Sequence, residues 1–170
     1  MLFSTDQLHK QDAPKSVSVH VITVSDTRSA ETDTSGRFIR NLLENNGHKV
    51  ASYYIVRDDP EQIAQLLGDL LGRADGDAVI LNGGTGISRR DRTYEVVSQV
   101  LEKIIDGFGE IFRFLSFQEV GSAAIMSRAV AGVSRDKVVI SVPGSENAVR
   151  LAMNRLIIPE LTHMVGTIRK

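Results

Sequence analysis

The hydrophobic pattern begins with a run typical of a buried strand and continues with a spacing typical of a helix. Residues 17–24 are mostly apolar and rich in β-branched side chains, which favours an interior strand. After a polar break, Asp33 or Thr34 can cap a helix whose apolar positions fall on one face. That helix is expected to end at 45–47, where Asn-Asn-Gly tolerates the left-handed backbone of a C-terminal cap.

The same succession of strand and helix recurs in the next part of the chain. A second strand is predicted at 48–56, and Pro60 fits the first turn of the helix that follows. Residues 77–81 form a short apolar strand that leads straight into the glycine-rich loop 82–86, Asn-Gly-Gly-Thr-Gly. Strands that alternate with helices in this way predict an α/β layered fold with a largely parallel sheet.

The alternation changes in the second half of the chain. The remaining predicted elements are a helix at 107–118, strands at 128–133 and 138–142, a helix at 146–157 capped by Ser145, and a short helix after Pro159. A polar turn at 134–137 joins the two strands, which predicts a β-hairpin. We therefore expect a single α/β domain with a largely parallel sheet and a late β-hairpin.

Length and composition support one ordinary globular domain. The 170 residues are enough for one sizeable core, which we place at 17–170. The segment 1–16 mixes polar and charged residues, lacks the apolar stretch of a signal peptide, and is expected to be a flexible N-terminal tail. No apolar run approaches the roughly 20 residues needed to span a bilayer. We expect a cytoplasmic protein.

Charge and cysteine content exclude several kinds of site. The formal net charge of -1 gives no broad field for nucleic acid or a membrane, so we expect neither as a partner. Any anionic ligand must then be held by local groups. With no cysteine, the chain has no disulfide, thiolate nucleophile or thiolate metal site.

Polar or glycine-rich residues follow each strand that is expected to be parallel. These segments are 25–27, 57–59, 82–91 and 143–145. Because the carboxyl ends of parallel strands lie at one edge of a sheet, we expect the loops to open on the same edge. The sequence therefore predicts a ligand site there.

The glycine-rich loop 82–86 carries the most information among these segments. Its three glycines let the backbone pass close to a ligand and turn N–H groups toward an anion, which predicts a site for a phosphate-bearing small molecule. The alternative is a tight strand-to-helix turn without a ligand. A P-loop would need Gly-Lys-Ser/Thr, but Ile87 and Ser88 follow Gly86. The spacing of a dinucleotide fingerprint is absent as well.

Two aspartates, Asp58 and Asp91, stand in separate loops at this edge. Magnesium favours one or two carboxylates together with phosphate oxygens, so the pair suits a magnesium-nucleotide. Asp91 could instead cap the helical segment that follows, a role that Thr93 could share, and Asp58 could be an acid favoured by a helix dipole. None of the four histidines has metal-ligand spacing with another, and we assign none a catalytic role.

Six short motifs occur along the chain in an order known from one family. They are Thr23-Val24-Ser25-Asp26-Thr27; Asp33-Thr34-Ser35-Gly36; Asn82-Gly83-Gly84-Thr85-Gly86 with Arg90-Asp91; Gly107-Phe108-Gly109-Glu110; Ser127-Arg128; and Pro143-Gly144-Ser145. Each motif alone is weak, but six in order at fitting distances are specific. The chain resembles the molybdopterin-binding proteins of molybdenum cofactor biosynthesis, most closely the MoaB branch beside its MogA relatives. The resemblance runs from Val17 to the C-terminal helix.

The resemblance implies a three-layer α/β/α domain that assembles as a homotrimer, sometimes paired into a hexamer. Active relatives adenylylate molybdopterin. The terminal phosphate of the pterin attacks the α-phosphate of ATP in the presence of Mg²⁺, and pyrophosphate leaves. Molybdopterin, ATP and Mg²⁺ are then the small-molecule partners, and no tightly bound prosthetic group is expected. No protein nucleophile is needed, because the attacking group is the substrate's own phosphate.

The family's site residues fall on matching positions of this sequence. Asp58 and Asp91 would be the catalytic acids, and both would act through the magnesium of the nucleotide. The substrate-binding positions would be Ser25, Asp26, Gly83, Gly84, Thr85, Gly86, Pro143, Gly144 and Ser145.

Two positions depart from the family pattern. Asn82 stands where many members have Thr, and the late loop reads Pro-Gly-Ser-Glu where active relatives often have Pro-Gly-Asn-Pro. The second feature belongs to the MoaB branch, some of whose members are doubtful enzymes, although Asp58 and Asp91 are both kept here. Besides an adenylyltransferase, two hypotheses stay open: a non-catalytic molybdopterin-binding or carrier protein, and a structural or signalling module on the same scaffold.

The helix at 107–118 carries more apolar side chains than one narrow stripe can hold. The set is Phe108, Ile111, Phe112, Phe114, Leu115 and Phe117. Such a helix is either buried in the core or part of an interface between copies of the chain.

Overall fold

The computed structural model describes residues 13–170. The tail predicted at 1–16 therefore lies largely outside the described residues. Of its described part, Ser16 donates a hydrogen bond from its hydroxyl to the carbonyl of Gly47 at 2.6 Å.

Strands and helices alternate as the sequence predicts. In chain order they are β1 (Ser18–Val24), α2 (Thr34–Asn45), β2 (Lys49–Val56), α3 (Pro60–Gly72), β3 (Ala78–Asn82), α4 (Thr93–Val100), β4 (Lys103–Ile104), α5 (Asp106–Val120), the 3-10 segment η1 (Gly121–Met126), β5 (Val130–Ser134), β6 (Lys137–Val142), α6 (Glu146–Ala152), the π-helical turn η2 (Met153–Ile157) and α7 (Ile158–Ile168). The expected caps are present. Asp33 accepts a hydrogen bond from the Gly36 N–H at the start of α2, and Gly47 has a left-handed φ of 78° just beyond its end.

The strands form one sheet in the order β2-β1-β3-β6-β5-β4. The first four strands in this order pair in parallel, and β5 pairs with β6 in the antiparallel sense, which confirms the late hairpin. Its turn residues Arg135 and Asp136 have φ of 46° and 58°, as a two-residue hairpin turn of the primed type requires.

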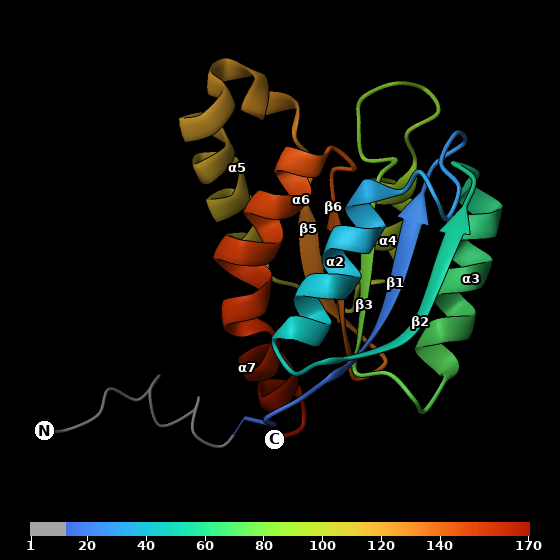
Figure 1. Cartoon of the computed structure of the whole chain (residues 1–170), viewed down its shortest axis with the longest axis vertical. Helices are drawn as coiled ribbons and strands as arrows, with labels where there is room; N and C mark the ends of the chain where they lie inside the picture. The colour runs from blue at the N-terminus through green and yellow to red at the C-terminus, as the bar shows by residue number, and fades with distance from the viewer. Residues whose placement is uncertain (1–12) are drawn as a thin grey trace, which may run out of the picture.

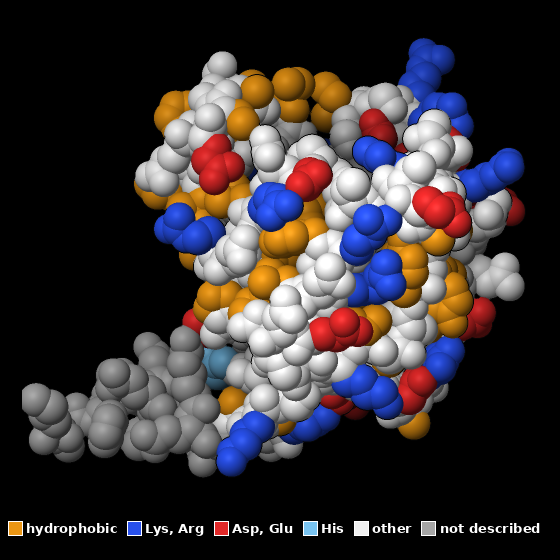
Figure 2. Space-filling view, viewed as in Figure 1, with side chains coloured by type: hydrophobic (Ala, Val, Ile, Leu, Met, Phe, Trp, Pro, Cys, Tyr) orange, Lys and Arg blue, Asp and Glu red, His pale blue; other side chains and the backbone are white. Residues whose placement is uncertain are grey.

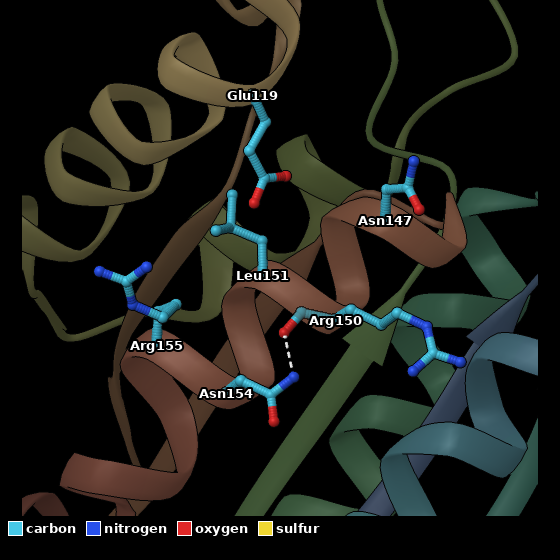
Figure 3. Close-up of a pocket in the computed structure, with 6 residues that line it drawn as sticks. All are labelled: Glu119, Asn147, Arg150, Leu151, Asn154 and Arg155. Atoms are coloured by element: carbon cyan, nitrogen blue, oxygen red, sulfur yellow. Dashed lines mark hydrogen bonds between the residues drawn. The ribbon is translucent and has the colours of Figure 1, made fainter.

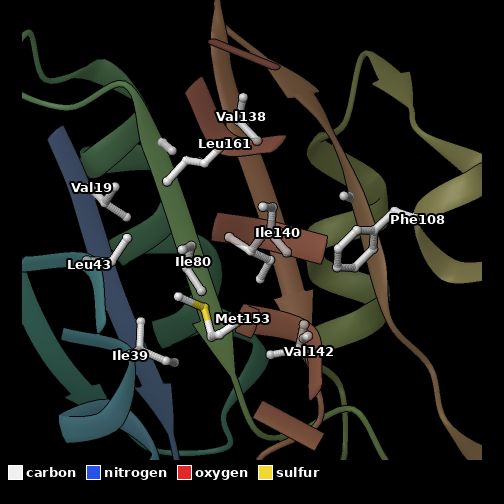
Figure 4. Packing of buried hydrophobic residues seen from close by; sticks show 14 of the residues in the cluster. Val19, Ile39, Leu43, Ile80, Phe108, Val138, Ile140, Val142, Met153 and Leu161 are labelled. Carbon is white, nitrogen blue, oxygen red and sulfur yellow. The ribbon is translucent and has the colours of Figure 1, made fainter. Parts of the chain in front are cut away.

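Helices cover both faces of the sheet (Figure 1). A larger buried cluster joins one face to α2, α5, α6 and α7, and Figure 4 shows part of it around Ile80, Ile140 and Met153. A second cluster joins the other face to α3 and α4 through residues such as Leu67 and Val97. The three-layer α/β/α fold is therefore confirmed. No helix within residues 13–170 is long and apolar enough to cross a membrane.

Two features of the chain differ from the predicted elements. The two-residue strand β4, which pairs with β5, was not expected, because two residues are too few to show a pattern. The helix predicted at 146–157 corresponds to α6 and η2, and the helix predicted after Pro159 is α7, but the three follow one another without the expected break. A proline ring would clash with the carbonyl four residues earlier in a regular α-helix, and the wider π-helical turn just before it makes room.

The predicted wide apolar helix is partly core and partly surface. Phe108 and Phe112 of α5 are buried, whereas Phe114 and Phe117 are 62% and 57% exposed. Further exposed apolar side chains on α5 and η1 are Ile111, Val120, Ile125 and Met126. Figure 2 shows an apolar area over α5 at one end of the molecule.

Candidate functional site

The four strand-end loops meet at one edge of the sheet, in places backbone against backbone. Gly83 lies so close to the carbonyl of Val24 that a side chain there would collide with it. Gly144 packs on Gly83 in turn, because a Cβ on Gly144 would lie 2.9 Å from the Gly83 Cα. The N–H of Ser25 donates to the carbonyl of Val56 at 2.9 Å. The loops after β1, β2, β3 and β6 therefore form one surface, as the topology predicts (Figure 1).

The glycine loop presents unpaired N–H groups. Gly83 and Gly84 have φ of 99° and 63°, which side-chain-bearing residues adopt only with strain. The N–H groups of Gly84, Thr85 and Gly86 have no hydrogen-bond partner among residues 13–170, although Thr85 is buried. A tight turn without a ligand would leave these donors unused, whereas an anion would satisfy them.

The carbonyl groups of the same loop are held from below. The Thr93 N–H donates to the carbonyl of Gly84 at 2.9 Å. Arg128 donates from Nε to the carbonyl of Thr85 at 2.9 Å and from Nη2 to that of Gly86 at 2.5 Å. Because the carbonyls point toward Arg128 and α4, the loop is fixed in a conformation defined by main-chain contacts.

Arg128 is itself held by a carboxylate. Its Nη1 lies 2.5 Å from Oε1 of Glu95, and the guanidinium sits 5.0 Å from the centre of the Tyr94 ring. The hydrogen bond from Arg128 lowers the pKa of Glu95, so that Glu95 stays charged and the pair persists. Arg128 also reaches the carbonyl of Asp91 at 3.3 Å. One side chain therefore links both ends of the loop.

Asp58 is not the cap of α3. That position is taken by Asp59, whose carboxylate accepts from the Gln62 N–H at 2.9 Å. Oδ1 of Asp58 is buried without a hydrogen-bond partner and would lie 2.9 Å from a Cβ on Gly84, so the carboxylate faces the glycine loop. Burial raises the pKa of Asp58, and the neighbouring charges of Asp91 and Asp26 raise it further.

Asp91 is likewise free of a cap role. The residue before α4 is Arg92, and no side chain caps that helix. Oδ2 of Asp91 accepts from the Ser88 N–H at 3.1 Å and would lie 2.6 Å from a Cβ on Gly86. The two aspartates therefore flank the glycine loop, Asp58 beside Gly84 and Asp91 beside Gly86.

Thr93 adds a third oxygen to this edge. It is fully buried, its hydroxyl has no hydrogen-bond partner, and it lies against the same side of Gly84 as Asp58. Carboxylate and hydroxyl oxygens are ligands that Mg²⁺ accepts, so these residues fit such an ion. Within residues 13–170, no three His, Asp or Glu side chains form a complete metal site. An ion here would need oxygens from a phosphate as well.

The predicted residues of the first loop have different tasks. The hydroxyl of Ser25 accepts hydrogen bonds from the N–H groups of Thr27 and Arg28, both at 3.2 Å, and so shapes its own turn. Asp26 pairs with the guanidinium of Arg90, and its Oδ1 lies 3.4 Å from the N–H of Asp58. Of Ser25 and Asp26, only Asp26 therefore adds a charge next to Asp58.

The late loop is tied to α2 and opens into a groove. The Ser35 hydroxyl donates to the carbonyl of Gly144 at 3.1 Å, and Ser145 caps α6 through the Ala148 N–H, as predicted. A cavity of about 330 Å³ lies beside the loop. Its lining comprises Ser116, Glu119, Val120, Ser127, Pro143, Ser145, Glu146, Asn147, Ala148 and Leu151.

The groove continues along α6 into a second hollow of about 280 Å³ (Figure 3). The two share Glu119, Asn147 and Leu151. In Figure 3 the Glu119 carboxylate of α5 points toward Leu151 across the space between the helices. Glu119 has no hydrogen-bond or ion-pair partner within the part of the chain that the structure describes. Pro143, Gly144 and Ser145 thus stand between the glycine loop and an apolar-floored groove with a free carboxylate.

A buried polar network supports the edge from beneath. Asn82 donates to the Thr23 hydroxyl at 2.9 Å and to the Ile22 carbonyl at 3.2 Å, which explains how an amide serves at this departure from the family pattern. Asp33 accepts from the Tyr53 hydroxyl at 2.5 Å. Burial, together with this hydrogen bond and charge, raises the pKa of Tyr53 to about 12. The phenol therefore stays protonated and keeps donating.

Comparison with known proteins places the chain in a family. The model of a family described as "probable molybdopterin binding domain" matches residues 20–163. The chain belongs to this molybdopterin-binding domain family. The resemblance of its motifs to that family is thereby confirmed.

Relatives in this family match almost the full chain. Molybdenum cofactor biosynthesis protein B of Halalkalibacterium halodurans is 56% identical over 163 residues, which are 95% of this chain and 96% of that protein. A crystal structure of a molybdenum cofactor biosynthesis protein B is 52% identical with a TM-score of 0.89, over 92% of this chain and 98% of the other. The tungsten cofactor synthesizing protein MoaB from Pyrococcus furiosus is 38% identical with a TM-score of 0.83, over 93% and 100%.

Several residues at the edge were not assigned by the sequence. Arg128 and Arg90 occur in motifs of the family resemblance, but no spacing rule connects Arg128 with a loop 42 or 43 positions earlier. Thr93 was considered only as a cap, and Glu119 not at all. The role of each residue becomes visible only in the fold, which brings its helix, strand or loop to the edge of the sheet where the strand-end loops meet.

Proposed function

We propose that this protein adenylylates molybdopterin with Mg-ATP and so works in molybdenum cofactor biosynthesis. Membership of the molybdopterin-binding family supports the substrate. The single observation that carries the reaction is the row of unpaired N–H groups at Gly84, Thr85 and Gly86, flanked by Asp58 and Asp91. N–H donors for the phosphate of the pterin and carboxylates for the magnesium of the nucleotide therefore lie at the same edge of the sheet.

The terminal phosphate of the pterin is assigned to the glycine loop. Arg128 and Thr93 hold the loop through its carbonyl groups, so its main-chain N–H groups can bind a phosphate without rearrangement, which fixes the attacking oxygen in place. A loop that carries no charge of its own binds the phosphate without neutralising its nucleophilic oxygen.

Asp58 and Asp91 are assigned to the magnesium of the nucleotide, with the Thr93 hydroxyl beside them. The unpartnered Asp58 Oδ1 and Thr93 Oγ1 support this assignment, because buried oxygens without a partner are costly unless a ligand uses them. Bound there, Mg²⁺ supplies positive charge that offsets the charge developing on the pyrophosphate. The carboxylates would then hold the nucleotide beside the glycine loop.

The fused ring of the pterin is assigned to the groove between α5 and α6. The groove begins at Pro143 and Ser145, next to the glycine loop. Leu151 and Val120 give it apolar surface for a flat ring, and the free Glu119 carboxylate can accept from ring N–H and amino groups. This arrangement places the ring on one side of the loop and the nucleotide on the other.

The test is product formation from defined substrates. Purified protein with molybdopterin, ATP and Mg²⁺ is expected to form adenylylated molybdopterin and pyrophosphate, and removal of Mg²⁺ with a chelator is expected to stop it. Asp58→Asn and Asp91→Asn should each lower the rate by about a hundredfold or more, as expected when a charge that stabilises phosphoryl transfer is lost. Asp69→Asn, an exposed acid on α3, is the matched control and should leave the rate unchanged.

Molybdopterin that binds without ATP-dependent product, and equally well after loss of Asp58, would favour the carrier hypothesis. Absence of molybdopterin binding would contradict both and favour a structural or signalling module.

A further inference from the structure

Arg90 occupies an unusual position at the edge. It lies in the loop between the glycine segment and α4, and its guanidinium contacts the carboxylate of Asp26. The Arg90 side chain is 75% exposed, and Asp26 is its only hydrogen-bonded or ion-paired partner in the part of the chain that the structure describes. One contact across the site therefore holds a long, exposed cationic side chain.

The acids that Arg90 faces outnumber it. Asp26 and Asp91 both act on Asp58 as like charges, and Arg90 acts on it as an opposite charge. The N–H of Asp58 also points at Asp26, over 3.4 Å. In the free protein, Arg90 is thus the nearby cation that offsets part of this negative charge.

The cluster is also open to a ligand. Thr93 is fully buried, its hydroxyl is unpartnered, and it faces the same side of Gly84 as the unpartnered oxygen of Asp58. A self-contained ion-pair cluster would leave no such oxygens unsatisfied. A small cation that joins these oxygens would meet Arg90 as a competing charge.

We propose that Arg90 is an exchangeable counter-ion. It pairs with Asp26 while the acid edge, formed by Asp26, Asp58 and Asp91, holds no ligand. When the divalent cation of the nucleotide binds there, Arg90 leaves Asp26 and binds the nucleotide phosphates. This inference rests on the proposed function and adds a second role for the loop between the glycines and α4.

The chemistry of the guanidinium suits both partners. Its planar fork of N–H donors matches a carboxylate and a phosphate equally well, so the same side chain can transfer from one to the other. An exposed ion pair is weak and easily exchanged, whereas a buried one would resist displacement. The extent to which Arg90 is exposed is therefore what permits the transfer.

The test uses Mn²⁺ as the probe, first alone and then with ATP. Arg90→Ala is compared with Arg89→Ala, the adjacent exposed arginine, which makes no ion pair or hydrogen bond among the described residues. Free Mn²⁺ is measured by electron paramagnetic resonance during titration. Arg90→Ala should bind Mn²⁺ alone at least about fivefold more tightly than the natural protein, since its competitor is gone. At saturating Mn²⁺ the same variant should bind ATP at least about fivefold more weakly.

The opposite signs of these two effects distinguish exchange from general damage. Arg89→Ala should change neither affinity, and Arg90→Lys should fall between the natural protein and Arg90→Ala. Equal Mn²⁺ affinity in the natural protein and Arg90→Ala would overturn the inference, as would loss of both affinities together. If the two effects appear with the expected signs but no adenylylated product forms, the inference stands and the proposed reaction fails.

Discussion

His20 is a buried side chain far from the acid edge whose surroundings bear on stability. It lies in β1 with no exposed surface, its Nδ1 is 2.7 Å from the Ser52 hydroxyl, and its Nε2 has no hydrogen-bond partner. Asp75 approaches Nε2 at 3.5 Å, while Arg73 and Lys137 add positive charge nearby. Burial lowers the pKa of His20 below its ordinary value of 6.5, and the two cations add to this against the opposing effect of Asp75.

Stability should therefore fall in mild acid. A histidine with a lowered pKa in the folded state takes up its proton more readily when unfolded, so the loss begins as pH falls through 6.5 and ends below the folded-state pKa. His20→Gln should reduce the slope of unfolding free energy against pH in this window by up to about 1.4 kcal/mol per pH unit. Urea denaturation at several pH values measures it.

His48 provides the comparison, because burial lowers its pKa as well. His48→Gln should leave the part of the slope due to His20 in place. An unchanged slope in His20→Gln would show that the imidazole does not carry this pH dependence.

Gly84 is a position where a single methyl group should disturb both the backbone and the neighbouring acid. Its φ is 63°, and a Cβ there would collide with the Thr93 hydroxyl and lie 2.9 Å from Oδ1 of Asp58. Gly84→Ala should cost about 1–3 kcal/mol of folding stability from backbone strain and displace the acids enough to abolish adenylylation. Gly68→Ala in α3, where a Cβ meets nothing within 4 Å, should instead stabilise the protein by about 0.5–1 kcal/mol. Thermal denaturation and the product assay measure both.

At the residue level, sequence located the acids but could not choose their roles. Adjacent Asp58 and Asp59 are equally suited to begin α3, and only the backbone path shows that Asp59 is the cap and Asp58 faces the loop. The same holds for Asp91, because Arg92 occupies the position before α4. Which side of a turn a carboxylate takes depends on tertiary contacts that no short pattern encodes. The catalytic roles of both acids remain predictions.

At the scale of elements, β5 and the glycine loop are coupled through Arg128, which lies just before β5. Its hydrogen bonds to the carbonyls of Thr85, Gly86 and Asp91 connect the antiparallel part of the sheet to a loop on the parallel part. The loop conformation therefore depends on an element that contributes nothing else to the acids.

Arg128→Ala should release the loop without unfolding the domain. Loss of a charged donor with several acceptors is expected to cost about 2 kcal/mol. Amide hydrogen exchange in residues 84–92 should become faster at Ser88 and Asp91, whose N–H groups are hydrogen-bonded, while exchange in β1 and β3 stays slow. Arg128→Lys keeps the charge but lacks the fork, so its effect on exchange should be intermediate. Arg73→Ala, which breaks an exposed ion pair with Asp75, should leave exchange in 84–92 unchanged. Equal loop protection in all variants would contradict the coupling.

Long regular elements were predicted well because each carries a repeated signal. β1 and α2 combine a hydrophobic pattern with end signals such as Asp33 and Gly47, so their bounds agree within a residue or two. β4 has no such signal, and neither has η2, which joins α6 to α7 without a break, although Pro159 lies in the first turn of α7 as predicted. Both depend on neighbours: β4 on pairing with β5, and η2 on room for a wide turn.

At the scale of the whole molecule, the exposed apolar side chains of α5 and η1 indicate a surface that another protein chain covers. Phe114, Phe117 and Ile125 are 62%, 57% and 81% exposed, which is unusual for a surface that faces water alone. We expect copies of this chain to cover one another here, in the homotrimer or hexamer that the family resemblance implies.

Charges placed on this surface should separate the copies. Phe114→Glu with Phe117→Glu is expected to convert an oligomer into a monomer, because two carboxylates would be buried at the interface. Gln65→Glu adds the same charge at an exposed polar position of α3, on the opposite face of the sheet from α5, and should leave the assembly intact. Light scattering after size-exclusion chromatography gives the mass of each. A natural protein that elutes as a stable monomer would refute the expectation.

The packing of Gly83 between the Val24 carbonyl and Gly144 has a consequence for how the family can diversify. These loops are aligned by main-chain atoms, so their spacing does not depend on which side chains they display. Substitutions at exposed positions such as Asp26 or Ser145 can then change which ligand is preferred while the framework stays in register. Ligand preference at this edge can therefore change by single substitutions during evolution while the loops keep their positions, as long as Gly83 and Gly144 are retained.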